Sequence, residues 1–133
     1  MKNIIIVTGG SGFVGSNLIR FLIDKTKYKI ISLDDYSSGN KKNHIKNKRV
    51  HYMSGHTKDI NKKLYKYKSK ISTIFHFGEF SRIFQSFMQM NKCLQSNTIG
   101  TNAVFDFCLK NNIKLIYSAT SASLGNNGKD KDL

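Results

Sequence analysis

The sequence predicts an α/β fold in which a doubly wound parallel sheet of about five strands carries helices on both faces. Short runs of β-branched residues alternate along the chain with amphipathic segments of helical length, the pattern of a parallel sheet. A glycine-rich turn separates the first strand from the first helix. The chain has 133 residues, enough for one domain with a hydrophobic core, so residues 1–133 are expected to form one domain.

The first half of the chain alternates strand and helix signals. Residues 3–8 form a β-branched run followed by glycines, which is typical of a strand buried on both faces. A helix is expected over 13–24, because apolar residues recur there at spacings of three and four. The apolar face of this helix is expected to consist of Phe13, Val14, Leu18, Phe21 and Leu22. Two further strands are predicted over 29–33 and 50–53, separated by a polar loop.

The second half continues the alternation. Helices are expected over 59–67, 81–90 and 93–109, and strands over 73–77 and 113–118. The last helix is expected to direct four residues towards the core, namely Asn97, Val104, Phe105 and Cys108. The expected strand order is 3-2-1-4-5, with a ligand bound at the carboxyl ends of the strands beside the switch point.

The composition excludes several classes of protein. With 39% hydrophobic and 23% charged residues the chain is not a disordered tail. No apolar run approaches the roughly 18 residues of a membrane span, and the start of the chain lacks the features of a secretory leader. Its two cysteines form neither a disulfide framework nor a metal-ligand pair, so a reducing cytoplasm is the expected location and no metal is expected. His76 is expected to be a packing residue within a strand.

The net charge of +14 raises nucleic acid or an anionic membrane as a partner. Lysine accounts for 19 of the 22 basic residues, and residues 40–70 hold 11 of the 22 against one acid, Asp59. The combined enrichment in Lys, Asn and Ile is typical of an AT-rich genome, and Lys lacks the planar fork with which Arg recognises phosphates and bases. We therefore expect no membrane partner and no specific nucleic-acid partner.

The strongest functional signal is the segment Thr8-Gly9-Gly10-Ser11-Gly12-Phe13-Val14-Gly15. It follows a predicted strand and opens a predicted helix, and Asp34 stands 19 positions after Gly15. Glycines allow a tight turn and let a pyrophosphate approach the backbone, where N–H groups at the helix start meet its charge. Asp34 would accept hydrogen bonds from an adenosine ribose and would repel a 2′-phosphate, so the expected cofactor is NAD rather than NADP.

These motifs resemble the extended short-chain dehydrogenase/reductases, and within them the NAD-dependent sugar-nucleotide epimerases and dehydratases such as the UDP-glucose 4-epimerases. The likeness covers nearly the whole chain, through the segments 8–15, 34–40, 74–79, 97–104 and 117–125. It implies a Rossmann-type fold that binds NAD. The implied cofactor residues are Gly9, Gly12, Phe13, Val14, Gly15, Asp34, Asp35, Phe77, Gly78, Glu79 and Asn97. The resemblance also implies that the hydroxyl of Thr120 is catalytic and bonds the reacting sugar oxygen.

Three departures from the family pattern bear on activity. His56 replaces the acid that the family usually has after the third strand for the adenine amino group, and Leu124 replaces a tyrosine. No tyrosine is followed four residues later by a lysine, so the family's proton-transferring Tyr-x-x-x-Lys pair is absent. The resemblance implies the N-terminal portion of a longer enzyme that is inactive alone, with the fifth strand as a sheet edge and with Phe105 and Phe107 short of partners.

The expected function is the NAD-binding portion of a sugar-nucleotide epimerase, in which NAD takes a hydride from a sugar carbon and returns it. A dehydratase of the same family is less favoured, because residues 120–122 read Thr-Ser-Ala where the resemblance would give Thr-Asp-Glu. A non-catalytic dinucleotide-binding module is a further alternative, followed by a basic nucleic-acid binder. The expected partners are a nucleotide-sugar, a C-terminal half, and a second copy of the chain in a homodimer.

Overall fold

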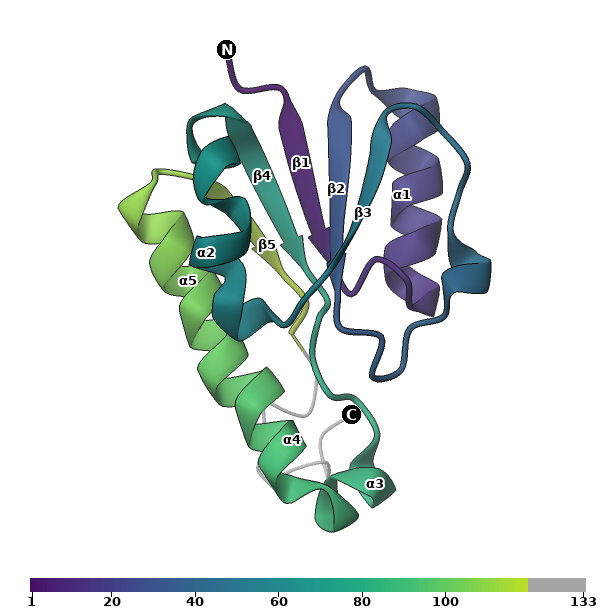
Figure 1. Cartoon of the computed structure of the whole chain (residues 1–133), viewed down its shortest axis with the longest axis vertical. Helices are drawn as coiled ribbons and strands as arrows, with labels where there is room; N and C mark the ends of the chain where they lie inside the picture. Colours follow the sequence, from purple (N-terminus) through teal and green to yellow (C-terminus); the bar gives the residue numbers. More distant parts are fainter. Residues whose placement is uncertain (120–133) are drawn as a thin grey trace, which may run out of the picture.

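The computed structural model describes residues 1–119, which fold into three layers around a five-stranded parallel sheet (Figure 1). The strands are β1 (Ile4–Thr8), β2 (Lys29–Asp34), β3 (Val50–Ser54), β4 (Ile71–His76) and β5 (Lys114–Tyr117). The sheet order β3-β2-β1-β4-β5, with every neighbouring pair parallel, confirms the predicted Rossmann-type order. The chain winds from β1 out to β3 and then from β4 out to β5, so the topological switch point lies between β1 and β4.

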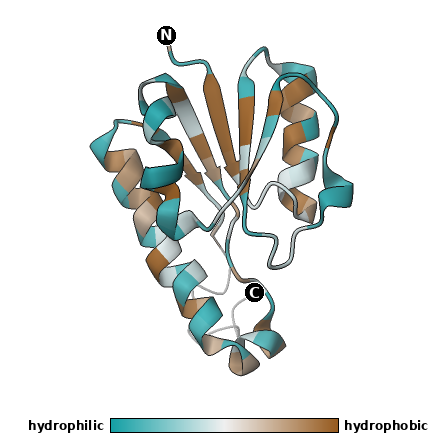
Figure 2. Ribbon diagram, in the orientation of Figure 1, coloured by the Kyte–Doolittle hydropathy of each residue, from teal (hydrophilic) through white to brown (hydrophobic). Residues whose placement is uncertain are grey.

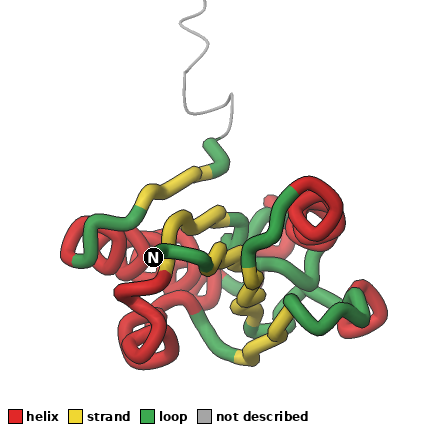
Figure 3. The backbone as a smooth tube through the Cα atoms, turned by 90° about the horizontal axis from the view of Figure 1, so that it is seen from above, coloured by secondary structure: helices red, strands yellow, loops and turns green. Residues whose placement is uncertain are grey.

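Helices cover both faces of the sheet, as Figure 3 shows from above. Helix α1 (Phe13–Lys25) packs on one face, and α2 (Ile60–Leu64) and α5 (Thr101–Lys110) pack on the other. The remaining helical segments are α3 (Ile83–Met88), α4 (Met90–Leu94), the π-helical η4 (Gln95–Gly100), and the 3₁₀ segments η1 (Lys41–Asn43), η2 (Thr57–Asp59) and η3 (Tyr65–Lys70). The helix predicted over 93–109 is therefore a run that passes from α4 through η4 into α5.

Strand β1 contributes buried residues to the two hydrophobic cores, one on each face of the sheet. Ile5 and Val7 pack with Ile19 of α1 on one face, and Ile4 and Ile6 pack with residues of α2 and α5 on the other. All five residues of β1 are buried, as expected for a central parallel strand covered on both faces. Figure 2 shows the strands as largely hydrophobic, whereas the helices carry both hydrophobic and hydrophilic residues.

The buried face of α1 differs from the prediction. Its buried residues are Gly15, Ser16, Ile19 and Leu22. Phe13 and Val14 are 83% and 56% exposed, and Phe21 is exposed as well. Periodicity grouped these apolar residues on one face, but the first turn of α1 follows the carboxyl end of β1 and borders a cleft rather than the sheet. Phe13 and Val14 therefore have no strand to pack against.

Strand β5 forms one edge of the sheet, as predicted. Phe105 is 39% exposed and packs edge-on against the Tyr117 ring, with ring centroids 5.5 Å apart. Its predicted place in the core is therefore wrong. Phe107 is only 2% exposed and lies in the core between the sheet, α2 and α5, so it does not lack partners. Cys108 is buried in the same core, as predicted, and burial raises the pKa of its thiol to about 11.

The described residues contain neither a membrane-spanning helix nor a metal-binding cluster. Within residues 1–119, no helix combines the length and apolar character needed to cross a membrane. The same residues hold no group of three or more His, Cys, Asp or Glu side chains arranged to bind a metal ion.

Candidate functional site

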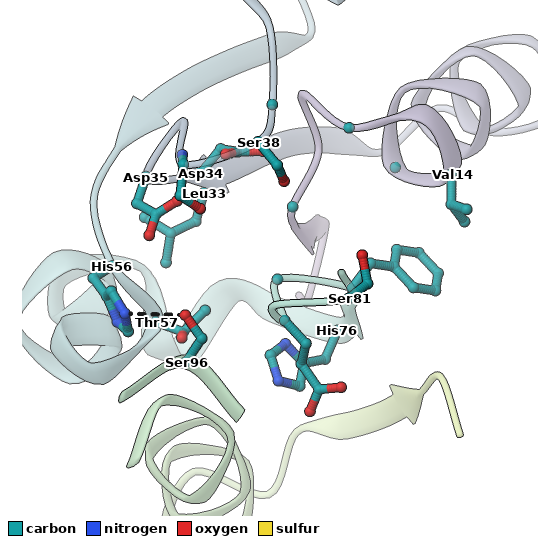
Figure 4. A pocket seen from close by; sticks show the side chains of 18 of the residues that line it. Val14, Leu33, Asp34, Asp35, Ser38, His56, Thr57, His76, Ser81 and Ser96 are labelled. Atoms are coloured by element: carbon teal, nitrogen blue, oxygen red, sulfur yellow. Dashed lines mark hydrogen bonds between the residues drawn. The ribbon is translucent and has the colours of Figure 1, made fainter. Parts of the chain in front are cut away.

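A cleft of about 560 Å³ opens at the carboxyl ends of the strands, a volume typical of small-ligand sites. The turn after β1 forms its middle, and most of the remaining wall comes from the segments that follow β2, β3 and β4, with Ser96 of η4 and Ser118 after β5. Figure 4 shows Asp34, Asp35 and Ser38 on one side and His56 and Ser96 on another. All of the predicted cofactor residues except Asn97 line this cleft.

Three glycines give the turn after β1 its shape. Gly9 has a left-handed backbone (φ +69°), and a Cβ there would lie 2.7 Å from the Phe77 carbonyl oxygen. A Cβ at Gly15 would overlap the Gly9 carbonyl oxygen, so glycine lets α1 lie directly on the turn. A Cβ at Gly12 would contact only the Gly9 oxygen, at 3.3 Å, and would otherwise enter open space. Gly12 therefore keeps the cleft free above the start of the helix.

The N-terminus of α1 faces this open space. Gly12 is the N-cap residue, so no side chain caps the helix, and its first turn contains no acid. The first intrahelical bond runs from the Ser16 N–H to the Gly12 carbonyl, at 3.0 Å. The N–H groups of the first turn therefore lack a partner within the helix, and together with the helix dipole they favour an anion such as a pyrophosphate. The residues at this turn fit the phosphates of a dinucleotide.

Asp34 lies buried at the end of β2 with its carboxylate towards the same turn. Oδ2 accepts a hydrogen bond from the Ser11 N–H (2.8 Å), and Oδ1 accepts one from the Tyr36 N–H (2.9 Å). A carboxylate offers about four acceptor positions, so two remain for the hydroxyls of a ribose. A Cβ at Gly39 would lie 2.9 Å from both oxygens, so glycine at this position leaves the carboxylate accessible.

Ser11 joins the loop after β2 to the glycine turn, a role that sequence reasoning missed. Its carbonyl oxygen accepts hydrogen bonds from the Asn40 N–H (3.0 Å) and from Nδ2 of Asn43 (2.8 Å). Its hydroxyl lies 3.1 Å from Nε2 of His44. The only sequence signal was its place between two glycines of the motif. These contacts fix Asp34 relative to the start of α1.

His76, at the end of β4, is a fully buried histidine with both ring nitrogens bonded. Its Nδ1 lies 2.6 Å from the Thr8 hydroxyl, and its Nε2 lies 2.9 Å from the Thr101 hydroxyl. The Thr8 oxygen also accepts the N–H groups of Phe77 (3.1 Å) and Gly78 (3.0 Å), so its own proton points to Nδ1. Burial lowers the pKa of His76 and favours the neutral ring. The packing role predicted for His76 is confirmed, and the segment after β4 is fixed through Thr8.

Glu79 brings a carboxylate to the β4 side of the cleft. Its Oε1 accepts hydrogen bonds from the hydroxyls of Thr101 (2.7 Å) and Tyr117 (2.9 Å). The second bond raises the pKa of Tyr117, because the phenol proton is held by a carboxylate. Thr101 donates to Glu79 and accepts from His76, which makes Nε2 the protonated nitrogen of that ring. Glu79 is thus linked through hydrogen bonds to the buried end of β4.

Asn97 lies in the π-helical η4 segment but does not line the cleft. Its Oδ1 accepts a hydrogen bond from the Phe80 N–H (2.6 Å), and its Nδ2 donates one to the Phe80 carbonyl (2.9 Å). Both ends of the amide are therefore used to hold the segment that follows Glu79. The structure shows Asn97 as a support for the segment after Glu79, and its predicted role as a cofactor residue stays a prediction.

His56 and Thr57 follow β3 and complete the cleft next to Asp35. Nδ1 of His56 accepts a hydrogen bond from the Lys58 N–H (3.0 Å), and Nε2 lies 3.4 Å from the Ser96 hydroxyl (Figure 4). Thr57 is wedged between two glycines, since a Cβ at Gly78 would lie 3.2 Å from its methyl group and one at Gly100 would overlap its hydroxyl. Sequence reasoning identified His56 only as a departure from a pattern.

The predicted catalytic residue, Thr120, and Leu124, which replaces a tyrosine of the family pattern, both lie outside the described residues. The catalytic role of Thr120 therefore stays a prediction. Apart from Asn97, the predicted cofactor residues line one cleft beside the switch point between β1 and β4, the place where α/β sheets of this order bind dinucleotides.

Solved structures of several epimerases share this fold. UDP-N-acetylglucosamine 4-epimerase from Methanobrevibacter ruminantium matches 100% of this chain and 43% of its own, with a TM-score of 0.82 and 30% identity. UDP-glucose 4-epimerase from Thermotoga maritima matches 88% of this chain and 38% of its own, with a TM-score of 0.78 and 26% identity. The chain therefore spans about two fifths of the length of these structures.

Sequence comparison leads to the same group of enzymes. dTDP-D-glucose 4,6-dehydratase from Dictyostelium discoideum is 32% identical over an alignment 138 residues long. The alignment covers 91% of this chain and 30% of that protein. The family model for the NAD-dependent epimerases/dehydratases matches residues 5–132, nearly the whole chain. The protein with this glycine turn, this Asp34 and this sheet order therefore belongs to the NAD-dependent epimerase/dehydratase family.

Proposed function

We propose that residues 1–133 form the NAD-binding domain of a sugar-nucleotide epimerase. The observation that carries the proposal is a single cleft that joins the uncapped N-terminus of α1 to the Asp34 carboxylate. These are the two groups that a dinucleotide needs, one for its pyrophosphate and one for its adenosine ribose. A carboxylate at that place disfavours the 2′-phosphate of NADP, which supports NAD as the cofactor.

The chain's own residues would bind and orient the cofactor. The first turn of α1 would bind the pyrophosphate, and Asp34 and Asp35 would hold the adenosine side. The segment Phe77, Gly78 and Glu79 would flank the nicotinamide ribose, with Asn97 holding that segment through Phe80. When bound, NAD supplies a hydride acceptor that takes a hydride from a sugar carbon and returns it.

The sugar-nucleotide part of the proposal is supported by the relatives. The matched structure from Methanobrevibacter ruminantium is a UDP-N-acetylglucosamine 4-epimerase in complex with UDP-N-acetylmuramic acid. The matched protein from Dictyostelium discoideum is a dehydratase, so both activities occur among similar proteins. The local sequence Thr120-Ser121-Ala122 favours the epimerase, because it lacks the acid pair that the resemblance assigns to water elimination.

A second candidate is a dinucleotide-binding module without catalysis. The observation that favours it is the absence of any Tyr-x-x-x-Lys pair from the 133 residues. Thr120 could orient a sugar hydroxyl, but no pair of this kind is present to take its proton. General acid–base groups typically contribute about 10²–10⁴-fold to a rate.

An activity assay distinguishes the two candidates. The interconversion of UDP-glucose and UDP-galactose would be measured with the 133-residue chain alone and after addition of the C-terminal portion of a similar epimerase. We expect no turnover by the chain alone, measurable turnover with the added portion, and loss of that gain in Thr120→Val. Tight NAD binding with no turnover in any combination would favour the module, and robust turnover by the chain alone would contradict the proposed need for a separate Tyr-Lys pair.

A further inference from the structure

Glu79 is a carboxylate in the half of the cleft opposite to Asp34. It follows β4, whereas Asp34 ends β2, and the glycine turn after β1 lies between them. A dinucleotide that straddles the switch point, with its pyrophosphate at α1 and its adenosine ribose on Asp34, extends its other nucleotide over the β4 side. Glu79 therefore belongs to the end of the cleft that takes the nicotinamide half.

The Glu79 carboxylate is held in place by two hydroxyl groups. Both bonds reach Oε1, from Thr101 on α5 at 2.7 Å and from Tyr117 on β5 at 2.9 Å. Thr101 is itself fixed by the buried His76 ring. The second oxygen, Oε2, receives no hydrogen bond from residues 1–119. The residue is half-buried, so its charge is less screened by water than that of a surface glutamate.

No cation neutralises this carboxylate within the part of the chain that the structure describes. The ion pairs found there are Lys25–Asp24 and Lys110–Asp106, and neither involves Glu79. Arg82 lines the same cleft, but its guanidinium does not lie within 4.0 Å of the Glu79 oxygens. Glu79 therefore contributes a net negative potential to its end of the cleft.

We propose that Glu79 makes this cleft bind the oxidised dinucleotide, NAD⁺, more tightly than the reduced form, NADH. The inference rests on the proposed NAD-binding function. The nicotinamide ring carries a positive charge in NAD⁺ and none in NADH, while the rest of the molecule is unchanged. A fixed carboxylate at the nicotinamide end attracts only the oxidised ring, whereas the helix terminus and Asp34 contact parts that both forms share.

The size of the effect follows from Coulomb's law. For unit charges about 8 Å apart, an effective dielectric constant between about 20 and 80 gives roughly a two- to thirtyfold difference in binding. We expect a several-fold preference for NAD⁺ in a half-buried setting. A tenfold preference lowers the two-electron reduction potential of the bound cofactor by about 30 mV, so the bound cofactor is a weaker oxidant.

The test compares the dissociation constants of NAD⁺ and NADH for the full chain and for Glu79→Gln, measured by isothermal titration at about 50 mM salt. Glutamine keeps the shape and an oxygen that can accept from Thr101, but it removes the charge. The dissociation constant of NADH divided by that of NAD⁺ should fall at least threefold in Glu79→Gln. The matched control is Asp35→Asn, which removes a carboxylate at the adenosine end and should change both constants by the same factor.

Each outcome decides the inference. A ratio that is unchanged in Glu79→Gln, with both forms still bound, overturns the role of Glu79 and leaves NAD binding intact. Absence of binding by either form to the unaltered chain overturns the proposed function and this inference with it. If Glu79→Gln fails to fold, the salt dependence of the unaltered chain decides: the preference should shrink between about 50 mM and 1 M salt as screening increases, and a constant preference would overturn the proposal.

Discussion

The Asp34 carboxylate has a structural role and a proposed binding role at once. Its two oxygens accept the N–H groups of Ser11 and Tyr36, which ties the glycine turn to the loop after β2. The same oxygens retain acceptor positions that face the cleft. Sequence spacing predicts that Asp34 binds a ribose, but it gives no sign of the two backbone bonds, which depend on how two loops meet.

Replacement of Asp34 by alanine should therefore change both binding and stability. We expect NAD affinity to fall by at least tenfold and the preference for NAD over NADP to narrow, because the repulsion of a 2′-phosphate disappears. Loss of the two buried backbone bonds should lower the free energy of unfolding by about 1–3 kcal/mol. Isothermal titration with both cofactors and urea denaturation measure the two effects. If Asp34→Ala left the ratio of NAD affinity to NADP affinity unaltered, the proposed repulsion between Asp34 and the 2′-phosphate would be contradicted.

Other residues of the site could not be predicted, because their roles are contacts between distant parts of the chain. The role of Thr57 is to pack against two glycines, with its methyl group against Gly78 and its hydroxyl group against Gly100. The role of Ser11 is to accept, through its carbonyl oxygen, hydrogen bonds from Asn40 and Asn43 in the loop after β2. Nothing local in the sequence distinguishes these residues from ordinary loop positions, whereas glycine spacing and a carboxylate after a strand are local signals that need no tertiary contact.

At the level of elements, the strands were predicted closely and the faces of the helices less well. A buried parallel strand is a near-continuous hydrophobic run, a pattern that β1 fits along its whole length and that β2 and β4 fit over part of theirs. The face of α1 was misassigned because periodicity does not reveal where a helix extends past the sheet. The orientation of Asn97 could not be predicted from helical periodicity either. Asn97 lies in the π-helical η4, which has a different hydrogen-bond spacing from an α-helix.

The turn between β1 and α1 allows a matched pair of substitutions that separates binding from stability. Gly15→Ala places a Cβ on the Gly9 backbone and should lower the free energy of unfolding by about 1–3 kcal/mol. Gly12→Ala meets only one atom at 3.3 Å, so the fold should change little while NAD affinity falls at least tenfold. Urea denaturation and NAD titration of both variants measure this contrast. If Gly12→Ala bound NAD normally, the first turn of α1 would not be the pyrophosphate site.

At the scale of the whole molecule, the chain is strongly basic, and most of its basic residues are lysines. The net charge is +14, and in η3 the ammonium groups of Lys66 and Lys68 lie over the rings of Tyr67 and Tyr65, at 5.0 and 4.0 Å. These contacts pair the exposed Tyr65 ring and the half-buried Tyr67 ring with the chain's own lysines. The surface therefore favours phosphate contacts over stacking on nucleic-acid bases.

Any association with nucleic acid should be non-specific and sensitive to salt. Lysine–phosphate contacts release counterions, so affinity for duplexes of unrelated sequence should be similar and should fall steeply from about 50 to 200 mM salt. Fluorescence anisotropy with two labelled duplexes of different sequence measures both properties. A tight complex that distinguishes the two sequences at about 200 mM salt would show that the basic surface has a binding function of its own.

The central claim is that the cleft at the carboxyl ends of the strands binds NAD, and calorimetric titration of the 133-residue chain with NAD and with NADP tests it most directly. The structure predicts one NAD site per chain, because the glycine turn, the start of α1 and Asp34 line a single cleft. NADP should bind at least tenfold more weakly, since its 2′-phosphate meets the Asp34 carboxylate. Equal or tighter binding of NADP, or no heat of binding with either dinucleotide, would contradict the account.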